Sequence, residues 1–523
     1  AIIQITLLIN ILITIFAVSY LYNFKIQYFV SFIEKDKYNK FFLFILFIFL
    51  LFSLMPTTDA DSLAYHLNIP KNIIENKKLI YSGLHFHEVF YGTGEAFFLT
   101  GLLLDNYQIG RLVNFIGYFS IFSIIYTSIS KSKKLKKSNI ILLIILCTPV
   151  LFQLFDSSKP QLIFVAINFL VFFLIFEIKP KSSNSTNIFL LISILLVCSF
   201  LGKIVFLVPC LMLITYFFIK NFNFISKKIL FFIVFYLLFL TLIFFAKYQI
   251  YGNHSLYFLS IIQEENSSFD LFIKSLRQSN QLNYFPFSLF VPLSKIDILG
   301  NLGYFALFFL LIKVKKFNLE KVIIFSIFLI YMLLGFRHAR FFLEPYLFYI
   351  YIFIKSNYSI NKFDNINLKF LAIPQIIFMC LIYIYLSLNL NIIFDSKSRS
   401  DYLNNYSYGY QIHEFLNRKI KDKSNILINQ RTLFYSKHNI VYTEFLKFKS
   451  VIDKNTLDKL TSFNPEFLVD INNTSYLKKC RSKLLFKENV TMYKSKNLLK
   501  SNFPKIPVYV YKINKKVWPG CLD

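Results

Sequence analysis

Two aspartates stand where an apolar run ends, in the stretch "MPTTDADSLAYHLNIPK" at residues 55–71. The run before them, "FFLFILFIFLLFSL", is typical of a membrane helix, so Asp59 and Asp61 are expected at a membrane surface. One role is structural, because Asp61 is a good N-cap for a helix that begins at Ser62. The other role is chemical, because partial desolvation suits a carboxylate to act as a general base or a metal ligand. Which aspartate would act stays open.

Tyr65 and His66 follow Asp61 by four and five residues. In a helix, the residue four positions on lies on the same face, so Tyr65 is expected near the Asp61 carboxylate. We therefore predict that Tyr65 and His66 contact a substrate beside the two aspartates.

Basic residues form a second candidate group. Arg337, His338 and Arg340 lie in "GFRHARFFLEPYL", and Lys203 lies between two apolar runs in "CSFLGKIVFLVP". All four are expected at the outer face of a membrane, where basic residues are disfavoured, which makes them candidates for binding an anionic group. The structural alternative is that they extend toward lipid headgroups. The same reasoning applies to Lys159 in "FDSSKPQ".

A third group lies in "HFHEVF", which contains His85, His87 and Glu88. A His-x-His pair with a carboxylate could bind a divalent metal, although this spacing is common by chance. We favour contacts of His87 and Glu88 with a substrate. No sequence motif requires a cofactor, so the divalent metal stays an alternative.

The composition indicates the elements that would position these residues. The chain has 523 residues, of which 56% are hydrophobic, with 66 Phe and a net charge of +29. A soluble domain could not bury this much apolar surface, so the chain is expected to be a polytopic membrane protein. In a soluble protein the charge would suggest nucleic acid. Here Lys is expected in cytoplasmic loops, and no nucleic-acid partner is predicted.

About twelve apolar runs are long enough to cross a bilayer. They lie near residues 2–22, 40–55, 108–129, 139–155, 160–178, 187–202, 204–220, 228–249, 298–312, 322–336, 341–356 and 368–392. Alternate loops are rich in lysine, including "KSKKLKK" at 131–137 and "KVKKFNLEK" at 313–321. By the positive-inside rule these loops are cytoplasmic, which places the loops at 56–107 and 250–297 and the tail from 393 outside. The expected location is a bacterial inner membrane.

The loop at 56–107 is expected to contain two helices on the outer membrane surface. "SLAYHLNIPKNIIENKK" has apolar residues at helical spacing, and "EVFYGTGEAFFLTGLLL" behaves similarly.

The tail from 393 to 523 is expected to form a small extracytoplasmic α/β domain. A helix is predicted in "YGYQIHEFLNRKI", and strands in "NILINQ", "NIVYTEF", "PEFLVDI" and "PVYVYKI". Cys480 and Cys521 could pair if this domain lies in an oxidising compartment. Residues 1–392 form the expected transmembrane domain.

The order of these motifs resembles the GT-C glycosyltransferases, which include protein O-mannosyltransferases and lipid A aminoarabinose transferases. An outer first loop opens on an acidic pair with a nearby Tyr, although this chain has "DAD" where "DE" is usual. "CSFLGKIVFLVP" at 198–209 resembles the mid-chain helix pair of the family. "YQIYGNHSLYF" at 248–258 resembles its entry into a large outer loop, with His254 in place of Pro, and "GFRHARFFLEPYL" resembles its late Arg-aromatic-Pro motif. The resemblance spans about residues 40–360.

This resemblance implies an all-α membrane fold and an enzyme that transfers a hexose or pentose from a polyprenyl-phosphate donor. The acceptor would be a lipid, glycan or protein outside the cytoplasm, as in the biosynthesis of cell-envelope glycans. Asp61 or Asp59 would serve the acceptor hydroxyl, and Arg340, Arg337 and Lys203 would hold the departing lipid phosphate.

Two other classes of function remain. A flippase-like transporter of lipids or polysaccharides also has about twelve helices, but transporters usually place ionisable residues near the bilayer midplane. An envelope scaffold would use the tail as its binding module and would tolerate substitution of every residue named above.

Overall fold

The computed structural model divides the chain into two compact units. Unit 1 comprises Ala1–Met55, Gly92–Leu242 and Asn280–Phe394, and unit 2 comprises Pro56–Tyr91, Ile243–Ser279 and Asp395–Asp523. The residues that the structure describes are 37–77, 91–104, 106–130, 138–155, 157–177, 185–221, 285–292, 300–304, 318–356, 387–407, 409–443, 454–473, 477–491 and 505–522, with scattered positions within 238–249, 306 and 370–384. The expected spans at 2–22, 228–249 and 298–312 lie wholly or largely outside them, and the span at 368–392 is described in part.

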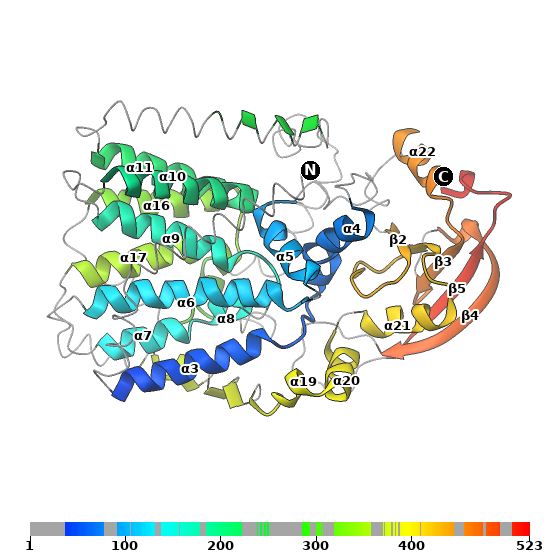
Figure 1. Cartoon of the computed structure of the whole chain (residues 1–523), viewed down its shortest axis with the longest axis horizontal. Helices are drawn as coiled ribbons and strands as arrows, with labels where there is room; N and C mark the ends of the chain where they lie inside the picture. The colour runs from blue at the N-terminus through cyan, green and yellow to red at the C-terminus, as the bar shows by residue number, and fades with distance from the viewer. Residues whose placement is uncertain are drawn as a thin grey trace. The chain divides into compact units, whose positions relative to one another are not determined.

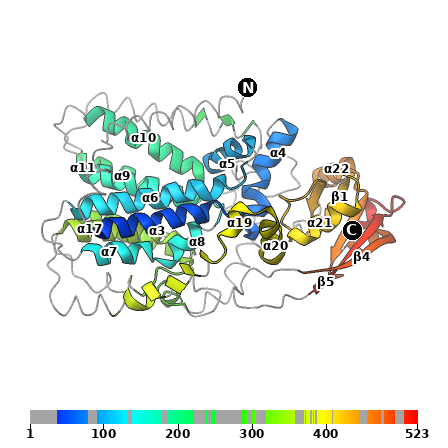
Figure 2. The same ribbon diagram turned by 60° about the horizontal axis from the view of Figure 1, so that its bottom comes forward.

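Unit 1 is a bundle of apolar helices that run side by side (Figure 1, Figure 2). Its helices are α3 (Lys37–Ser53), α5 (Thr93–Leu103), α6 (Ile109–Ser130), α7 (Ser138–Leu146), α8 (Pro149–Phe155), α9 (Leu162–Glu177), α10 (Ser185–Gly202), α11 (Leu207–Asn221), α16 (Asn318–Leu333), α17 (Leu343–Lys355) and α19 (Asn391–Phe394). Short 3-10 turns are η3 (Ile204–Phe206), η7 (Phe287–Leu289) and η8 (Ala339–Phe341). Phenylalanine fills the helix contacts. For example, the rings of Phe172 in α9 and Phe348 in α17 stack with their centroids 4.4 Å apart.

Polar contacts join four helix ends at one end of unit 1. Glu177 at the end of α9 pairs with Lys355 at the end of α17, with 2.5 Å between Nζ and Oε1. Lys220 at the end of α11 donates to the carbonyl oxygens of Ile175 and Phe176. Glu320 in the first turn of α16 accepts from the hydroxyl of Tyr216 in α11. Helices α9, α11 and α17 thus end where α16 begins, as an alternating bundle requires.

One expected helix is two helices in the structure. The run at 139–155 forms α7 and α8, which are separated at Cys147 and Thr148. Pro149 explains the break, because it has no N–H to donate and its ring disfavours a helical conformation at the residue before it. The next amide, of Val150, donates to the carbonyl oxygen of Asn301 instead of continuing α7.

Helix α16 has an apolar face that is exposed on the bundle. Val322, Phe325, Leu329 and Leu333, spaced three or four residues apart, are each at least 42% exposed. An exposed apolar stripe of this kind suits contact with lipid. Among the described residues, one helix, Ile109–Ile129, is long and apolar enough to cross a membrane alone, and Phe42–Ser53, Leu162–Glu177, Ile188–Gly202 and Leu207–Asn221 are shorter apolar helices.

Unit 2 contains a five-stranded mixed sheet in the order β2-β1-β3-β5-β4 (Figure 1). Its strands are β1 (Asn425–Ile428), β2 (Asn439–Tyr442), β3 (Phe467–Ile471), β4 (Arg481–Thr491) and β5 (Lys505–Ile513). The strands expected in the tail are confirmed as β1, β2, β3 and β5, whereas β4 was not expected. Strand β1 lies parallel to β2 and β3, and β5 lies antiparallel to β3 and β4.

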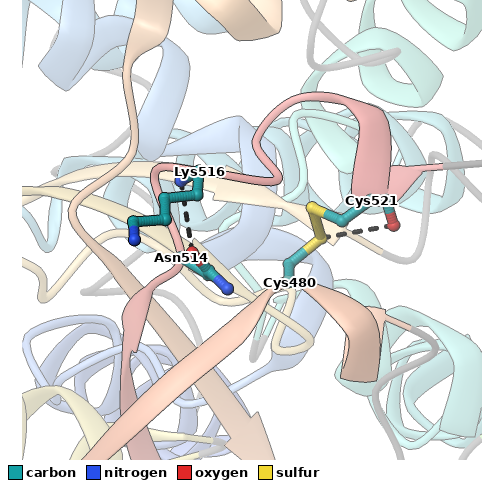
Figure 3. Close-up of a disulfide and its surroundings, with 4 residues drawn as sticks. All are labelled: Cys480, Asn514, Lys516 and Cys521. Carbon is teal, nitrogen blue, oxygen red and sulfur yellow. Dashed lines mark hydrogen bonds between the residues drawn. A yellow bond between two sulfur atoms is a disulfide. The ribbon is translucent and has the colours of Figure 1, made fainter.

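Helices cover both faces of this sheet. Helix α21 (Tyr410–Lys419), expected from the sequence, packs Ile412, Phe415 and Leu416 on one face, and α22 (Lys454–Phe463) packs Leu460 on the other. Helix α20 (Ser396–Tyr406) and the turns η10 (Leu477–Cys480) and η11 (Gly520–Leu522) complete the tail. Cys480 at the end of η10 and Cys521 in η11 form a disulfide, which Figure 3 shows, so the two cysteines that the sequence left able to pair do so.

The helical interpretation of the loop after α3 is also confirmed. Unit 2 contains the π turn η1 (Ser62–His66), in which Leu67 N donates to Ser62 O, followed by α4 (Asn68–Asn76). The second expected helix of this loop is α5, which belongs to unit 1.

Candidate active site

Asp59, and not Asp61, caps the turn that follows α3. Asp59 Oδ1 accepts a hydrogen bond from Ser62 N at 3.0 Å, and its carbonyl oxygen accepts from Leu63 N. Asp61 occupies the N-cap position of η1 with helical backbone angles and makes no side-chain cap hydrogen bond. The side-chain cap expected of Asp61 is therefore wrong, because the helical turn already begins at Ala60 and Asp59 is the residue that precedes it.

The Asp61 carboxylate instead forms an ion pair with the C-terminal part of the chain. Arg431, which follows β1, places its guanidinium 3.1 Å from Asp61 Oδ1. The side chain of Asp61 is 30% exposed and that of Arg431 is 46% exposed. Asp61 is therefore an oriented carboxylate that solvent can still reach.

Tyr65 and His66 lie in the same π turn. Their ring centroids are 4.1 Å apart, and Tyr65 is half-buried whereas His66 is buried. The structure thus places Asp59 and Asp61 just before one π turn and Tyr65 and His66 within it, and π turns are frequent at functional sites.

Arg340 lies at the end of unit 1 opposite the Glu177–Lys355 pair. Gln161, at the start of α9, donates from Nε2 to the carbonyl oxygen of Arg340 at 3.3 Å. Arg340 Nε is buried, and no acceptor for it lies among the described residues. A buried guanidinium N–H without an acceptor is a group that an anionic ligand could satisfy.

Hydrogen bonds fix the segment that carries Lys159, close to the turn η8 that contains Arg340. Asn114 in α6 is fully buried, and its amide donates to the carbonyl oxygens of Leu154, Ser157 and Lys159 at 2.7–3.1 Å. Asn114 therefore holds the connection between α8 and α9, from which Gln161 reaches Arg340.

Tyr331 in α16 contacts both segments that carry the other candidate basic residues, namely the segment with Lys203 and the segment with Arg337, His338 and Arg340. Its hydroxyl donates to the carbonyl oxygen of Val205, two residues after the half-buried Lys203. Its ring packs against Phe336 and Phe341, which flank Arg337, His338 and Arg340. Lys203, Arg337, His338 and Arg340 therefore come from two turns that Tyr331 holds at the same end of unit 1.

The third candidate group lies outside the described residues, since His85, His87 and Glu88 fall within 78–90. Within the part of the chain that the structure describes, no cluster of three or more His, Cys, Asp or Glu side chains is arranged to hold a metal ion.

Sequence reasoning missed two arginines. Arg111 in α6 is 2% exposed and donates to the carbonyl oxygen of Met55, at the end of the segment that follows α3. The argument that selected Lys203 could have found it, because Arg111 is also a basic residue at the expected outer end of a helix. Arg431 carried no such signal, since it lies in a polar tail where an arginine is ordinary.

Comparison with known families adds to this geometry. A family model described as the DUF1420 N-terminal domain matches residues 12–397, which is most of the chain. The chain belongs to the DUF1420 family. No curated protein matches the sequence of this DUF1420 member.

Solved structures show the fold of this DUF1420 protein. ArnT from Cupriavidus metallidurans, bound to undecaprenyl phosphate, matches with a TM-score of 0.54 and 11% identity, over 93% of this chain and 98% of that chain. The apo state of the same ArnT matches equally, over 92% and 98%. ArnT is a GT-C superfamily member, so the GT-C resemblance is confirmed for the fold.

Proposed function

We propose that this DUF1420 protein is a membrane glycosyltransferase that moves a sugar from a polyprenyl-phosphate donor to an acceptor hydroxyl. The observation that carries the proposal is the fold shared with an ArnT bound to undecaprenyl phosphate over nearly the whole length of both chains. The chain also contains carboxylate and basic side chains of the kind that such a transfer needs, and their presence supports the proposal. The acceptor is a lipid, glycan or protein, and the sugar is a hexose or pentose.

Asp61 is the proposed catalytic carboxylate. Asp59 is engaged as a helix cap, whereas Asp61 is ion-paired and accessible to solvent. The acceptor oxygen attacks the anomeric carbon, the bond from that carbon to the phosphate oxygen breaks, and the acceptor proton passes to the Asp61 carboxylate. Tyr65, His66, His87 and Glu88 are proposed to contact the sugar or the acceptor.

Arg340, Arg337, His338 and Lys203 are proposed to bind the lipid phosphate. Negative charge grows on that phosphate as the glycosidic bond breaks, and a positioned guanidinium stabilises this charge more in the transition state than in the ground state. The buried Arg340 Nε, with no acceptor among the described residues, supports this role. This scheme does not need a divalent metal. If the protein did bind one, His85, His87 and Glu88 would be its ligands.

The reaction is proposed to take place outside the cytoplasm, at a bacterial inner membrane. About twelve spanning helices within residues 1–392 would leave the loops at 56–107 and 250–297 and the domain 393–523 on the outer side. The Cys480–Cys521 disulfide supports this orientation, because structural disulfides persist in oxidising compartments.

The test is a transfer assay in membranes with radiolabelled polyprenyl-phosphate sugars. Asp61→Asn should lower kcat by about 10²- to 10⁴-fold, the usual contribution of a general base. Asp59→Asn is the matched control, because Asn caps helices as well as Asp does and should keep most of the activity. Arg340→Ala should lower kcat by about 10²-fold or more, with Arg340→Lys intermediate.

Full activity in Asp61→Asn would remove the proposed catalytic role. If the wild-type protein instead moved labelled lipid across reconstituted vesicles without transferring sugar, it would be a transporter on a glycosyltransferase fold.

A further inference from the structure

The C-terminal part of unit 2 reaches the acidic turn through residues 430–436, here called the docking segment. This segment follows β1 and contains Arg431, the partner of Asp61. The amides of Leu433 and Phe434 both donate to the carbonyl oxygen of Leu63 at 3.2 Å. Tyr435 donates from its hydroxyl to the carbonyl oxygen of Thr57 at 3.1 Å. The contacts thus lie on both sides of the "DAD" sequence.

Lys71 in α4 adds a third point of attachment. Its ammonium donates to the carbonyl oxygens of Phe434 and Ser436 at 2.7 and 2.6 Å and lies 5.7 Å from the ring centroid of Phe434. A half-buried ammonium bound to two carbonyl oxygens holds the docking segment whether or not Arg431 is present.

The docking segment is equally fixed to the C-terminal domain. The imidazole Nε2 of His413 in α21 lies within hydrogen-bond distance of the carbonyl oxygen of Thr432, and the amide of Asn417 donates to the carbonyl oxygen of Tyr435. Residues 430–436 therefore connect α21 to the acidic turn through hydrogen bonds to both.

The Arg431–Asp61 pair is poorly explained as a stabilising contact. Both side chains are substantially exposed, and exposed ion pairs contribute little to the stability of the fold. The backbone and Lys71 contacts already hold the two segments together. What the guanidinium adds is direction, because its N–H groups fix the position of Asp61 Oδ1.

We infer that Arg431 is a positioning residue for the transfer proposed above: through Asp61 it makes the C-terminal domain part of the catalytic apparatus, a role that rests on that proposed function. Arg431 acts on the carboxylate and not on the sugar donor. Its loss should therefore lower the rate of the chemical step without weakening substrate binding.

The first test is steady-state transfer by the full-length protein with Arg431→Ala, Arg431→Lys and Arg418→Ala. Arg418 is the matched control, because it is an exposed arginine in α21 paired with Glu488 at 3.7 Å. Arg431→Ala should lower kcat about 10- to 100-fold with KM changed less than about threefold, and Arg431→Lys should recover much of the loss. Arg418→Ala should match the wild type.

The second test needs no activity. Hydrogen exchange of the peptide spanning 57–67 in the purified protein should be about two- to fivefold faster in Arg431→Ala, with unchanged exchange in β3.

Wild-type kcat in Arg431→Ala, a raised KM at unchanged kcat, or unchanged exchange at 57–67 would each overturn the inference. Absence of transfer by the wild type would count against the proposed function alone, and hydrogen exchange would then decide whether Arg431 orders the acidic turn.

Discussion

Asp59 and Asp61 show how two identical side chains, separated by one alanine, are given different tasks by local geometry. Asp59 accepts a hydrogen bond from Ser62 N, whereas Asp61 forms an ion pair with Arg431. A sequence pattern identifies both as acids near a helix start. It does not show which of the two carboxylates accepts from the amide of Ser62, because that depends on the backbone dihedral angles of the turn. The structure makes this distinction, and the site hypothesis narrows to Asp61.

His413 predicts that unit 2 loses stability in acid. Burial lowers the pKa of His413 to about 4, with the charges of Lys71 and His438 acting in the same direction. The folded protein therefore holds neutral imidazole, while the unfolded chain takes up a proton below about pH 6.5. The stability contributed by the neutral form is complete above pH 6.5 and decreases as the pH falls toward 4, by roughly 3 kcal/mol in the limit.

Thermal unfolding in detergent between pH 7.5 and 4.5 measures this effect. The midpoint of unit 2 should fall with pH in the wild type and should fall less in His413→Gln, which keeps a donor for the Thr432 carbonyl oxygen but does not titrate. Parallel curves for the two proteins would show that His413 is not responsible.

Close approach of glycine backbones sets the spacing of the helices in unit 1. A Cβ added to Gly202 at the end of α10 would lie 2.3 Å from the ring of the buried Phe164 in α9. A Cβ on Gly92, before α5, would lie 2.3 Å from the carbonyl oxygen of Leu201. These contacts bring α5, α9 and α10 together beside Lys203.

Gly202→Ala should destabilise unit 1 by about 1–3 kcal/mol, because the Phe164 ring packs against Phe206 and has little room to move. Adding Phe164→Leu should restore part of the loss, so the double variant should be more stable than the sum of the two single effects predicts. Thermal unfolding in detergent compares them. Gly520→Ala is the control, since no atom lies within 4 Å of the added methyl group.

The sequence predicted much of the element order, and its failures have physical reasons. Apolar periodicity gave the helices of unit 1 and four strands of the sheet, because each of these elements buries a face. It missed β4, "RSKLLFKENVT", because an edge strand leaves charged residues exposed and has no clean alternation. It also missed Arg431, because pairing between residues so far apart in the chain leaves no local pattern.

The acidic turn and the C-terminal sheet belong to one compact unit, and the apolar helix bundle belongs to the other. The proposed catalytic carboxylate and the candidate phosphate-binding residues therefore belong to different units. The unit with the carboxylates also holds the disulfide, and the unit with the cations holds the apolar helices.

The disulfide predicts the side of the membrane on which unit 2 lies. In intact cells made permeable only at the outer envelope, a membrane-impermeant maleimide should label a Cys380→Ser variant, which lacks the exposed free thiol of Cys380, after mild reduction and not before. The double variant Cys480→Ser with Cys521→Ser should not gain this label. Labelling that appears only after the inner membrane is lysed would place unit 2 in the cytoplasm and contradict the proposed orientation. Loss of the disulfide should also cost unit 2 about 2–4 kcal/mol.

The π turn at Ser62–His66 has a consequence for how this segment can vary in length. A π turn holds one residue more than an α-helical turn, and each residue of an α-helix accounts for about 100° of rotation. Deleting any one residue of this turn would restore regular helix and turn Asp61 by about that angle relative to α4. The direction of the Asp61 carboxylate thus depends on the number of residues in this turn. A single-codon deletion would aim Asp61 away from Arg431 even if both side chains were kept.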